Sequence, residues 1–165
     1  MKLLITGGTG LIGSALVARL QARYEITVTS RSPRKAQQQL GAGVNVIKGL
    51  ADITDIGAFH GVINLQGEGI ADKRWSATQK QRLQDSRWQV TNELAQRIAE
   101  AEQPPKVLIS GSAIGYYGAQ GDEIMTEDKQ VELPDDFAQQ LCAKWERLAL
   151  QAQSPATRVC VLRTG

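Results

Sequence analysis

Short apolar runs alternate along this chain with longer segments in which apolar residues recur three or four positions apart. The first run covers residues 2–5 and ends at a cluster of glycines, and residues 11–22 after it show helical spacing. This order predicts a strand, a glycine turn and a helix. Further apolar runs predict strands over residues 25–30, 44–47, 61–65, 106–109 and 159–162.

The same spacing predicts three more helices, over residues 33–40, 77–102 and 136–153. Pro33 suits a first helical turn, and Ser76 and Asp135 are of the types that cap helix N-termini. Strands that are apolar throughout and alternate with helices are typical of a parallel sheet covered on both faces. We therefore expect one domain over residues 1–165 with a doubly wound α/β fold, the three-layer α/β/α Rossmann fold.

Composition narrows the range of partners. The chain has 165 residues, 19 basic and 17 acidic, and lacks the basic stripe that nucleic-acid binding needs. Its apolar runs are too short to cross a bilayer, and no signal-peptide pattern follows Met1. We expect a cytoplasmic protein whose partner is a small molecule rather than nucleic acid or a membrane, and the sequence leaves a homodimer open.

The glycine turn after the first strand has the spacing of a dinucleotide-binding loop. Gly7 permits a tight turn, Gly10 lets the backbone approach a pyrophosphate, and Gly13 lets the helix pack closely on the sheet. The helix that follows offers free N–H groups and a positive dipole end to the phosphates. The expected cofactor-binding residues of this loop are Gly7, Thr9, Gly10, Leu11, Ile12 and Gly13.

The end of the second strand indicates which dinucleotide binds. An NAD-binding chain normally has an acidic residue there, which accepts a hydrogen bond from the ribose 2′-hydroxyl. This chain has Arg31 and Arg34 instead, next to Ser30, and these side chains can bind a 2′-phosphate. The sequence therefore favours NADP over NAD as cofactor, with Arg31 the better placed arginine and Arg34 and Lys35 equally open to a solvated role.

These motifs, taken together, resemble the extended short-chain dehydrogenase/reductase superfamily, the NAD-dependent epimerase/dehydratase type. The matching segments are residues 6–13, Asp52, residues 64–67 and residues 110–118. Residues 67–75, 86–88 and 144–146 narrow the resemblance to a subfamily of nucleotide-sugar epimerase-like proteins of bacteria and animals. Members are roughly twice as long, so we expect this chain to be an N-terminal part that lacks most of the substrate-binding region.

The resemblance implies roles for several residues outside the glycine loop. Asp52 would lie near the adenine, and Leu65, Gln66 and Gly67 would border the cofactor. Ser112, in a turn of small residues at 110–112, would be the hydroxyl that hydrogen-bonds the substrate.

One part of the superfamily pattern is absent. A YxxxK motif on the helix after the fifth strand normally supplies a tyrosine acid/base and a lysine that lowers its pKa. This chain has Phe137 and Leu141 there, and a shift by one residue gives Ala138 and Cys142. Because phenylalanine cannot transfer a proton, the usual route for oxidising an alcohol is closed.

Other residues can be considered as substitutes for the missing pair. Tyr116 or Tyr117 lies in the loop beside Ser112 and can act as the acid. Lys144, or Lys80 and Arg87 on the long helix, can supply positive charge, although both lysines are also compatible with solvated positions. The resulting catalytic set is Ser112, Tyr116 and Lys144.

The remaining residues with chemical potential favour structural roles. Cys142 and Cys160 are distant in sequence from each other and from His60, the single histidine, so no metal site is expected. We expect both cysteines to be buried and His60 to lie in a loop. Residues 67–75 are different, because a glycine-rich charged segment after a strand's carboxyl end belongs over the cofactor crevice.

Two functions follow from these observations. The first is an NADP(H)-dependent enzyme of the epimerase/reductase type that acts on a small polar or nucleotide-linked substrate with an atypical acid/base. The second is a nucleotide-binding regulator or redox sensor that keeps the fold without catalysis. Ser112 and residues 67–75 favour the enzyme, whereas Phe137 favours the regulator.

Overall fold

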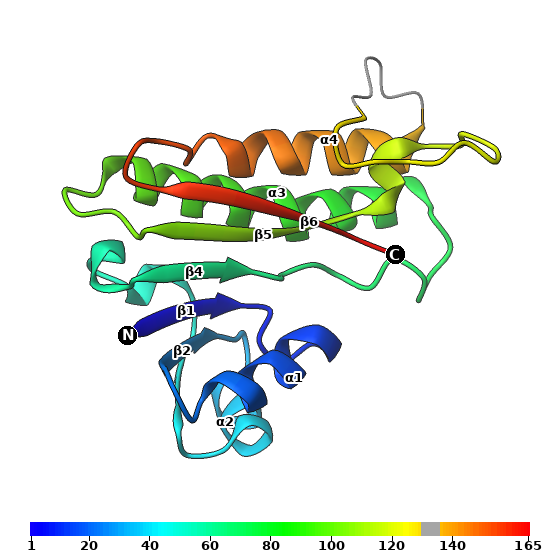
Figure 1. Cartoon of the computed structure of the whole chain (residues 1–165). Helices are drawn as coiled ribbons and strands as arrows, with labels where there is room; N and C mark the ends of the chain where they lie inside the picture. Colours follow the sequence, from blue (N-terminus) through cyan, green and yellow to red (C-terminus); the bar gives the residue numbers. More distant parts are fainter. Residues whose placement is uncertain (130–135) are drawn as a thin grey trace.

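The computed structural model describes residues 1–129 and 136–165, and its centre is a six-stranded sheet. The strand order is β3-β2-β1-β4-β5-β6 and every neighbouring pair is parallel (Figure 1). The strands are β1 (Lys2–Thr6), β2 (Glu25–Thr29), β3 (Val44–Ile47), β4 (Gly61–Asn64), β5 (Val107–Ala113) and β6 (Arg158–Thr164). The order reverses direction between β1 and β4, where an open parallel sheet binds its ligands.

Helices cover both faces of this sheet, as the expected Rossmann fold requires (Figure 1). They are α1 (Leu11–Leu20), α2 (Pro33–Leu40), α3 (Ala77–Glu100) and α4 (Phe137–Leu150). Consecutive residues of a strand point to opposite faces of the sheet. Ile5 packs in one cluster with residues of α1 and α2, whereas Leu4 packs in another with residues of α3 and α4. The prediction of a doubly wound, three-layer fold is confirmed.

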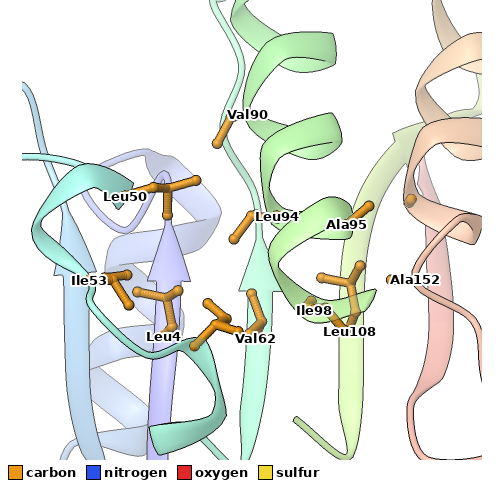
Figure 2. Packing of buried hydrophobic residues seen from close by; sticks show 12 residues of the cluster. Leu4, Leu50, Ile53, Val62, Val90, Leu94, Ala95, Ile98, Leu108 and Ala152 are labelled. Atoms are coloured by element: carbon orange, nitrogen blue, oxygen red, sulfur yellow. The ribbon is translucent and has the colours of Figure 1, made fainter. Parts of the chain in front are cut away.

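The layer between the sheet and α3 contains the larger buried cluster (Figure 2). Val90, Leu94 and Ile98 lie on one stripe of α3 and are at most 9% exposed. They pack against strand residues such as Val62 and Leu108. The apolar period that predicts this helix in the sequence is therefore the period of its buried face.

Capping residues set where the two long helices begin. The Ser76 hydroxyl accepts a hydrogen bond from the N–H of Gln79, which confirms Ser76 as the cap of α3. The cap of α4 is Asp136, whose carboxylate accepts from the N–H of Gln139 while the Gln139 side chain accepts from the Asp136 N–H. The expectation of Asp135 as cap is corrected to Asp136; Asp135 itself lies outside the described residues.

The predicted turn at residues 110–112 is wrong, because β5 continues through them to Ala113. Ser110, Gly111 and Ser112 pair in register with residues of β6, which is also longer than expected. Serine and glycine are common in turns, but pairing with a neighbouring strand outweighs that local preference. Short 3₁₀ helices at Leu50–Asp52, Ile56–Ala58 and Ile114–Tyr117 are further elements that the apolar pattern does not predict.

A buried ion pair connects α4 to the edge strand β6. Glu146 accepts hydrogen bonds from Arg163 at both carboxylate oxygens, each 2.9 Å long, and the two side chains are 6% and 17% exposed. The Ser112 hydroxyl donates to the same carboxylate over 2.6 Å. The guanidinium of Arg163 also stacks on Tyr116, 3.7 Å from the ring centre. This cluster ties the end of the sheet to its covering helix.

Replacing Leu94 by alanine removes a fully buried side chain from the larger cluster. We expect the free energy of unfolding to fall by about 3 kcal/mol, the loss typical of a buried leucine cavity. Urea unfolding followed by circular dichroism measures this loss. Leu150→Ala is the matched control, because Leu150 is 49% exposed and its truncation leaves no cavity. Equal losses for both variants would contradict the assigned core.

Replacing Glu146 by glutamine leaves Arg163 without its counter-ion in a mostly buried position. Removing one partner of such a pair costs about 3 kcal/mol, because the remaining charge stays desolvated. Urea unfolding at low ionic strength checks the value. Glu123→Gln provides the comparison, since Glu123 pairs with Lys129 on the surface and exposed pairs contribute less than about 1 kcal/mol. If Glu146→Gln and Glu123→Gln lost the same free energy of unfolding, the Glu146–Arg163 pair would not stabilise the contact between α4 and β6.

Candidate functional site

A cavity of about 870 Å³ opens at the carboxyl ends of the central strands. Its walls come from the glycine loop after β1, from the segments after β2, β3 and β4, and from one side of α3. Pockets for small molecules and cofactors usually span about 300–1,000 Å³. The cavity is therefore large enough for a dinucleotide.

The glycine loop forms the middle of this cavity. Gly7 has a φ of +72°, and a Cβ on it would lie 2.5 Å from the carbonyl oxygen of Leu65. Gly13 packs directly beneath the loop, where a Cβ would collide with the carbonyl oxygen of Gly7. Both positions therefore require glycine.

Three of the six predicted loop residues line the cavity: Gly7, Thr9 and Gly10. Leu11 and Ile12 form the exposed first turn of α1 and do not line it. Gly10 begins α1 with no side-chain cap, so backbone N–H groups of the first turn are left for a ligand. This is the arrangement by which a helix N-terminus binds phosphate.

Basic side chains gather at the end of the cavity over β2 and β3. Arg31 and Lys35 line it from the segment after β2, and Lys48 lines it from the segment after β3. Arg34 is exposed and is not among the lining residues. Lys48 was missed by sequence reasoning; its position directly after a strand's carboxyl end is the signal that could have found it.

A buried hydroxyl at this end has no hydrogen-bond partner among the residues that the structure describes. Thr29 is 7% exposed and lines the cavity, and in the described part of the chain its Oγ1 is a buried polar atom without a hydrogen bond. Such atoms are rare, because an unpaired buried polar group costs about 1–3 kcal/mol. The basic donors and this hydroxyl fit a ligand that carries a phosphate.

The neighbouring part of the cavity is apolar and suits an aromatic base. Leu50, Leu65 and Val90 contribute to its lining from the segments after β3 and β4 and from α3. Asp52, expected near the adenine, does not line the cavity. Its Oδ2 accepts hydrogen bonds from the N–H groups of Lys48 and Gly49, at 2.9 and 3.3 Å. The carboxylate therefore fixes the turn that presents Lys48.

A chain of buried polar side chains fixes the loop after β4. Thr6 donates to Asn64 over 2.6 Å, and Asn64 donates in turn to Thr91 of α3 over 2.8 Å. The indole N–H of Trp145 donates to the same Thr91 hydroxyl over 2.9 Å. Asn64 Oδ1 also accepts from the N–H of Gln66, which lines the cavity as expected. The network thus joins β1, β4, α3 and α4 just below the site.

The far end of the cavity is polar, and it includes Gly67 and Glu68 of the segment 67–75 that was expected over the cofactor crevice. Glu68 lines it from the loop after β4, beyond the predicted Leu65, Gln66 and Gly67. A polar stripe on α3 faces it with Arg82, Asp85, Ser86, Gln89 and Glu93. These residues recur three or four positions apart, and that polar period, adjacent to the apolar stripe of α3, was the available signal.

Ser112, Tyr116 and Lys144 do not converge on this cavity. Ser112 is 4% exposed and donates its hydroxyl hydrogen to Glu146. Tyr116 lies under the Arg163 guanidinium, and the Lys144 ammonium lies 4.0 Å from the centre of the Trp88 ring. Each of the three therefore contacts a different neighbour, and none lines the cavity.

The other candidates for the missing catalytic pair, Tyr117, Lys80 and Arg87, also contact groups of the protein. Tyr117 donates to the carbonyl oxygen of Thr126 and accepts from Arg163. Lys80 lies 5.0 Å from the ring centre of Phe137, the residue in place of the usual tyrosine. Arg87 donates to the carbonyl oxygens of Glu68 and Leu83 instead of projecting into the cavity.

Burial and hydrogen bonds shift several pKa values near the site. The hydrogen bond from Gln79, helped by Lys73 and Arg82, holds the pKa of Glu68 below its usual value. Burial lowers the pKa of Arg87 and raises that of Cys142. Glu68 is therefore a carboxylate at neutral pH, while Cys142 stays a thiol.

The other residues considered in the sequence behave as structural groups. Cys142 is buried as expected, whereas Cys160 is half-buried. His60 lies just before β4, and its Nδ1 accepts a hydrogen bond from the N–H of Lys2.

No helix among residues 1–129 and 136–165 is long and apolar enough to cross a membrane.

Known proteins are similar to this chain over nearly its whole length. The NAD dependent epimerase/dehydratase family matches residues 3–165. An epimerase family protein of Mycobacterium leprae is 37% identical over 163 residues, which cover 98% of this chain and 51% of the relative. The chain spans about half the length of the curated relatives it matches.

Solved structures share the fold. The human epimerase family protein SDR39U1, solved with NADPH, has a TM-score of 0.83 and 34% identity, over 100% of this chain and 54% of that one. MoeE5, solved with UDP-glucose and NAD, has a TM-score of 0.77 and 25% identity, over 99% and 54%. With its glycine loop, strand order and family match, this chain belongs to the NAD dependent epimerase/dehydratase family of extended short-chain dehydrogenases/reductases.

Proposed function

We propose that this domain binds NADP(H) in preference to NAD(H) and presents it for hydride transfer to or from a small polar substrate, of which nucleotide sugars are the expected class. The observation that carries the proposal is the basic end of the cavity, which Arg31 and Lys35 line from the segment after β2 and Lys48 lines from the segment after β3. A carboxylate at this place would instead favour the 2′-hydroxyl of NAD.

The residues around the cavity divide the cofactor between them. Arg31, Lys35 and Lys48 bind the 2′-phosphate, and the N-terminus of α1 with Gly10 binds the pyrophosphate. The apolar lining of Leu50 and Val90 takes the adenine. The bound cofactor supplies hydride transfer at its nicotinamide ring.

Relatives support both the cofactor and the substrate class. The human protein SDR39U1 was solved with NADPH, and MoeE5 was solved with a UDP-sugar. Ser112, Tyr116 and Lys144 stay the proposed catalytic set for proton transfer, although none of them lines the cofactor cavity. In such a site Ser112 would bind the substrate through its oxygen as acceptor, because its hydrogen is directed to Glu146.

A second function, a non-catalytic nucleotide-binding regulator or redox sensor, is favoured by one observation. Phe137 occupies the position of the usual tyrosine, and its ring packs between Trp75 and Lys80 instead of offering a hydroxyl. The two functions differ in an observable way, because only the enzyme oxidises NADPH in the presence of a substrate.

Replacing Arg31 by aspartate tests the cofactor preference. We expect NADPH affinity to fall at least about tenfold, since a charge-assisted contact to the 2′-phosphate becomes a repulsion, while NADH affinity stays the same or rises. Calorimetric titration with each nucleotide measures both constants. Arg34→Asp is the matched control, because it makes the same charge change outside the cavity lining. Parallel losses for NADPH and NADH in the Arg31 variant would contradict the assignment.

Replacing Thr29 by valine tests whether its unpaired hydroxyl meets the cofactor. The free protein should gain about 1 kcal/mol of stability, because a buried hydroxyl without a partner is removed. The affinity for NADPH should fall about fivefold, since the bound state loses a hydrogen bond. Thermal unfolding with and without NADPH measures both effects. A variant that is less stable without ligand would indicate that the hydroxyl already has a partner.

A further inference from the structure

Glu68 is one of three acidic residues that line the cavity, together with Asp85 and Glu93 of α3. It lines the cavity from the loop after β4, at the end opposite to Arg31, Lys35 and Lys48. A carboxylate there would repel phosphate, so its partner must donate hydrogen bonds. The question is which part of a bound dinucleotide reaches it.

The strand order places Glu68 relative to that dinucleotide. The basic end of the cavity lies over β3 and β2, the glycine loop follows β1, and Glu68 follows β4, the next strand in the sheet. Neighbouring strands are about 4.8 Å apart, so β2 and β4 are separated by about 10 Å. A dinucleotide with its 2′-phosphate at Arg31 and its pyrophosphate at Gly10 therefore carries its second ribose toward Glu68.

The protein holds Glu68 from several sides. The Glu68 N–H donates to Ser86 Oγ over 3.0 Å, and its carbonyl oxygen accepts from Arg87 Nη2 over 2.9 Å. Arg87 lies so close that a Cβ on Gly67 would be 2.9 Å from its Cζ, and it stacks on Trp145. The backbone of this loop is thus fixed to α3 and, through the indole, to α4.

The carboxylate itself is oriented by a buried amide. Gln79 is 5% exposed, and its Nε2 donates to Glu68 Oε1 over 3.0 Å. Lys73 lies 3.6 Å from the same oxygen. Within the described part of the chain no hydrogen bond reaches Oε2, and the Glu68 side chain is about one third exposed. One oxygen is therefore held by the protein and the other is available to a ligand.

We propose that the Glu68 carboxylate accepts hydrogen bonds from the hydroxyl groups of the second ribose, the one that carries the nicotinamide. This inference rests on the proposed function, because it requires a dinucleotide in the cavity. The Gln79 hydrogen bond and Lys73 keep the pKa of Glu68 low, which leaves it an acceptor throughout the neutral range. Glu68 is thus a binding residue for the half of the cofactor that reacts.

The experiment compares the binding of three ligands that all contain adenosine with a 2′-phosphate and differ in the rest of the molecule. NADPH contains the second ribose and the nicotinamide, 2′-phospho-ADP-ribose contains the ribose alone, and adenosine 2′,5′-bisphosphate lacks both. Calorimetric titrations use the whole chain, the Glu68→Gln variant and Asp72→Asn. Asp72→Asn is the control, because this substitution removes an equal charge from the same loop at a residue that does not line the cavity. Thermal unfolding of each protein confirms that it is folded.

The Glu68→Gln change should lower the affinity for NADPH and for 2′-phospho-ADP-ribose about tenfold, because a charge-assisted hydrogen bond is lost. The affinity for adenosine 2′,5′-bisphosphate should not change. Asp72→Asn should leave all three unchanged. Equal effects of Glu68→Gln on the three ligands, or an effect on NADPH alone, would overturn the assignment to the ribose. If the unaltered chain fails to bind adenosine 2′,5′-bisphosphate, the proposed function fails instead.

Discussion

The buried side chain of Asn64 is the point on which the site depends. It is completely enclosed, at the end of β4, and it hydrogen-bonds Thr6 at the end of β1 and Thr91 in the middle of α3. Trp145 joins α4 to the same Thr91 hydroxyl. A buried polar network of this kind is stable only when each member finds its partner. The ends of β1 and β4 are therefore held together, and the loops that follow them form the middle and one end of the cavity.

The cavity has an electrostatic direction that follows the strand order. Positive side chains lie over β2 and β3, backbone N–H groups lie after β1, and the Glu68 carboxylate lies after β4. In the proposed complex, a 2′-phosphate, a pyrophosphate and a ribose diol would meet these groups in the same order. Complementary charge along a ligand fixes its orientation more than it adds to affinity. In that proposed complex, the nicotinamide half of the dinucleotide would lie toward β4 and β5.

Beyond β4 the structure uses its polar groups for stability. Ser112, Glu146 and Arg163 bind one another where β5, α4 and β6 meet, and Arg163 stacks on Tyr116. The bidentate hydrogen bonds from Arg163 compensate the buried carboxylate for its lost contacts with water. The same residues therefore hold the edge of the sheet in place, and Ser112 is oriented by Glu146 instead of turning freely toward a substrate.

The sequence by itself determined the fold class, the glycine loop, the basic residues after β2 and the buried stripe of α3, because each depends on residues close together in the chain. Tertiary structure decided the rest. It extended β5 through Ser112 by pairing that strand with β6. It also brought Glu68 within hydrogen-bond distance of Gln79, whose amide side chain is buried by packing although glutamine is usually exposed. It also placed Tyr116 against Arg163 and Lys144 against Trp88. Contacts between distant segments depend on how strands pair and helices pack, and local residue spacing carries no record of them.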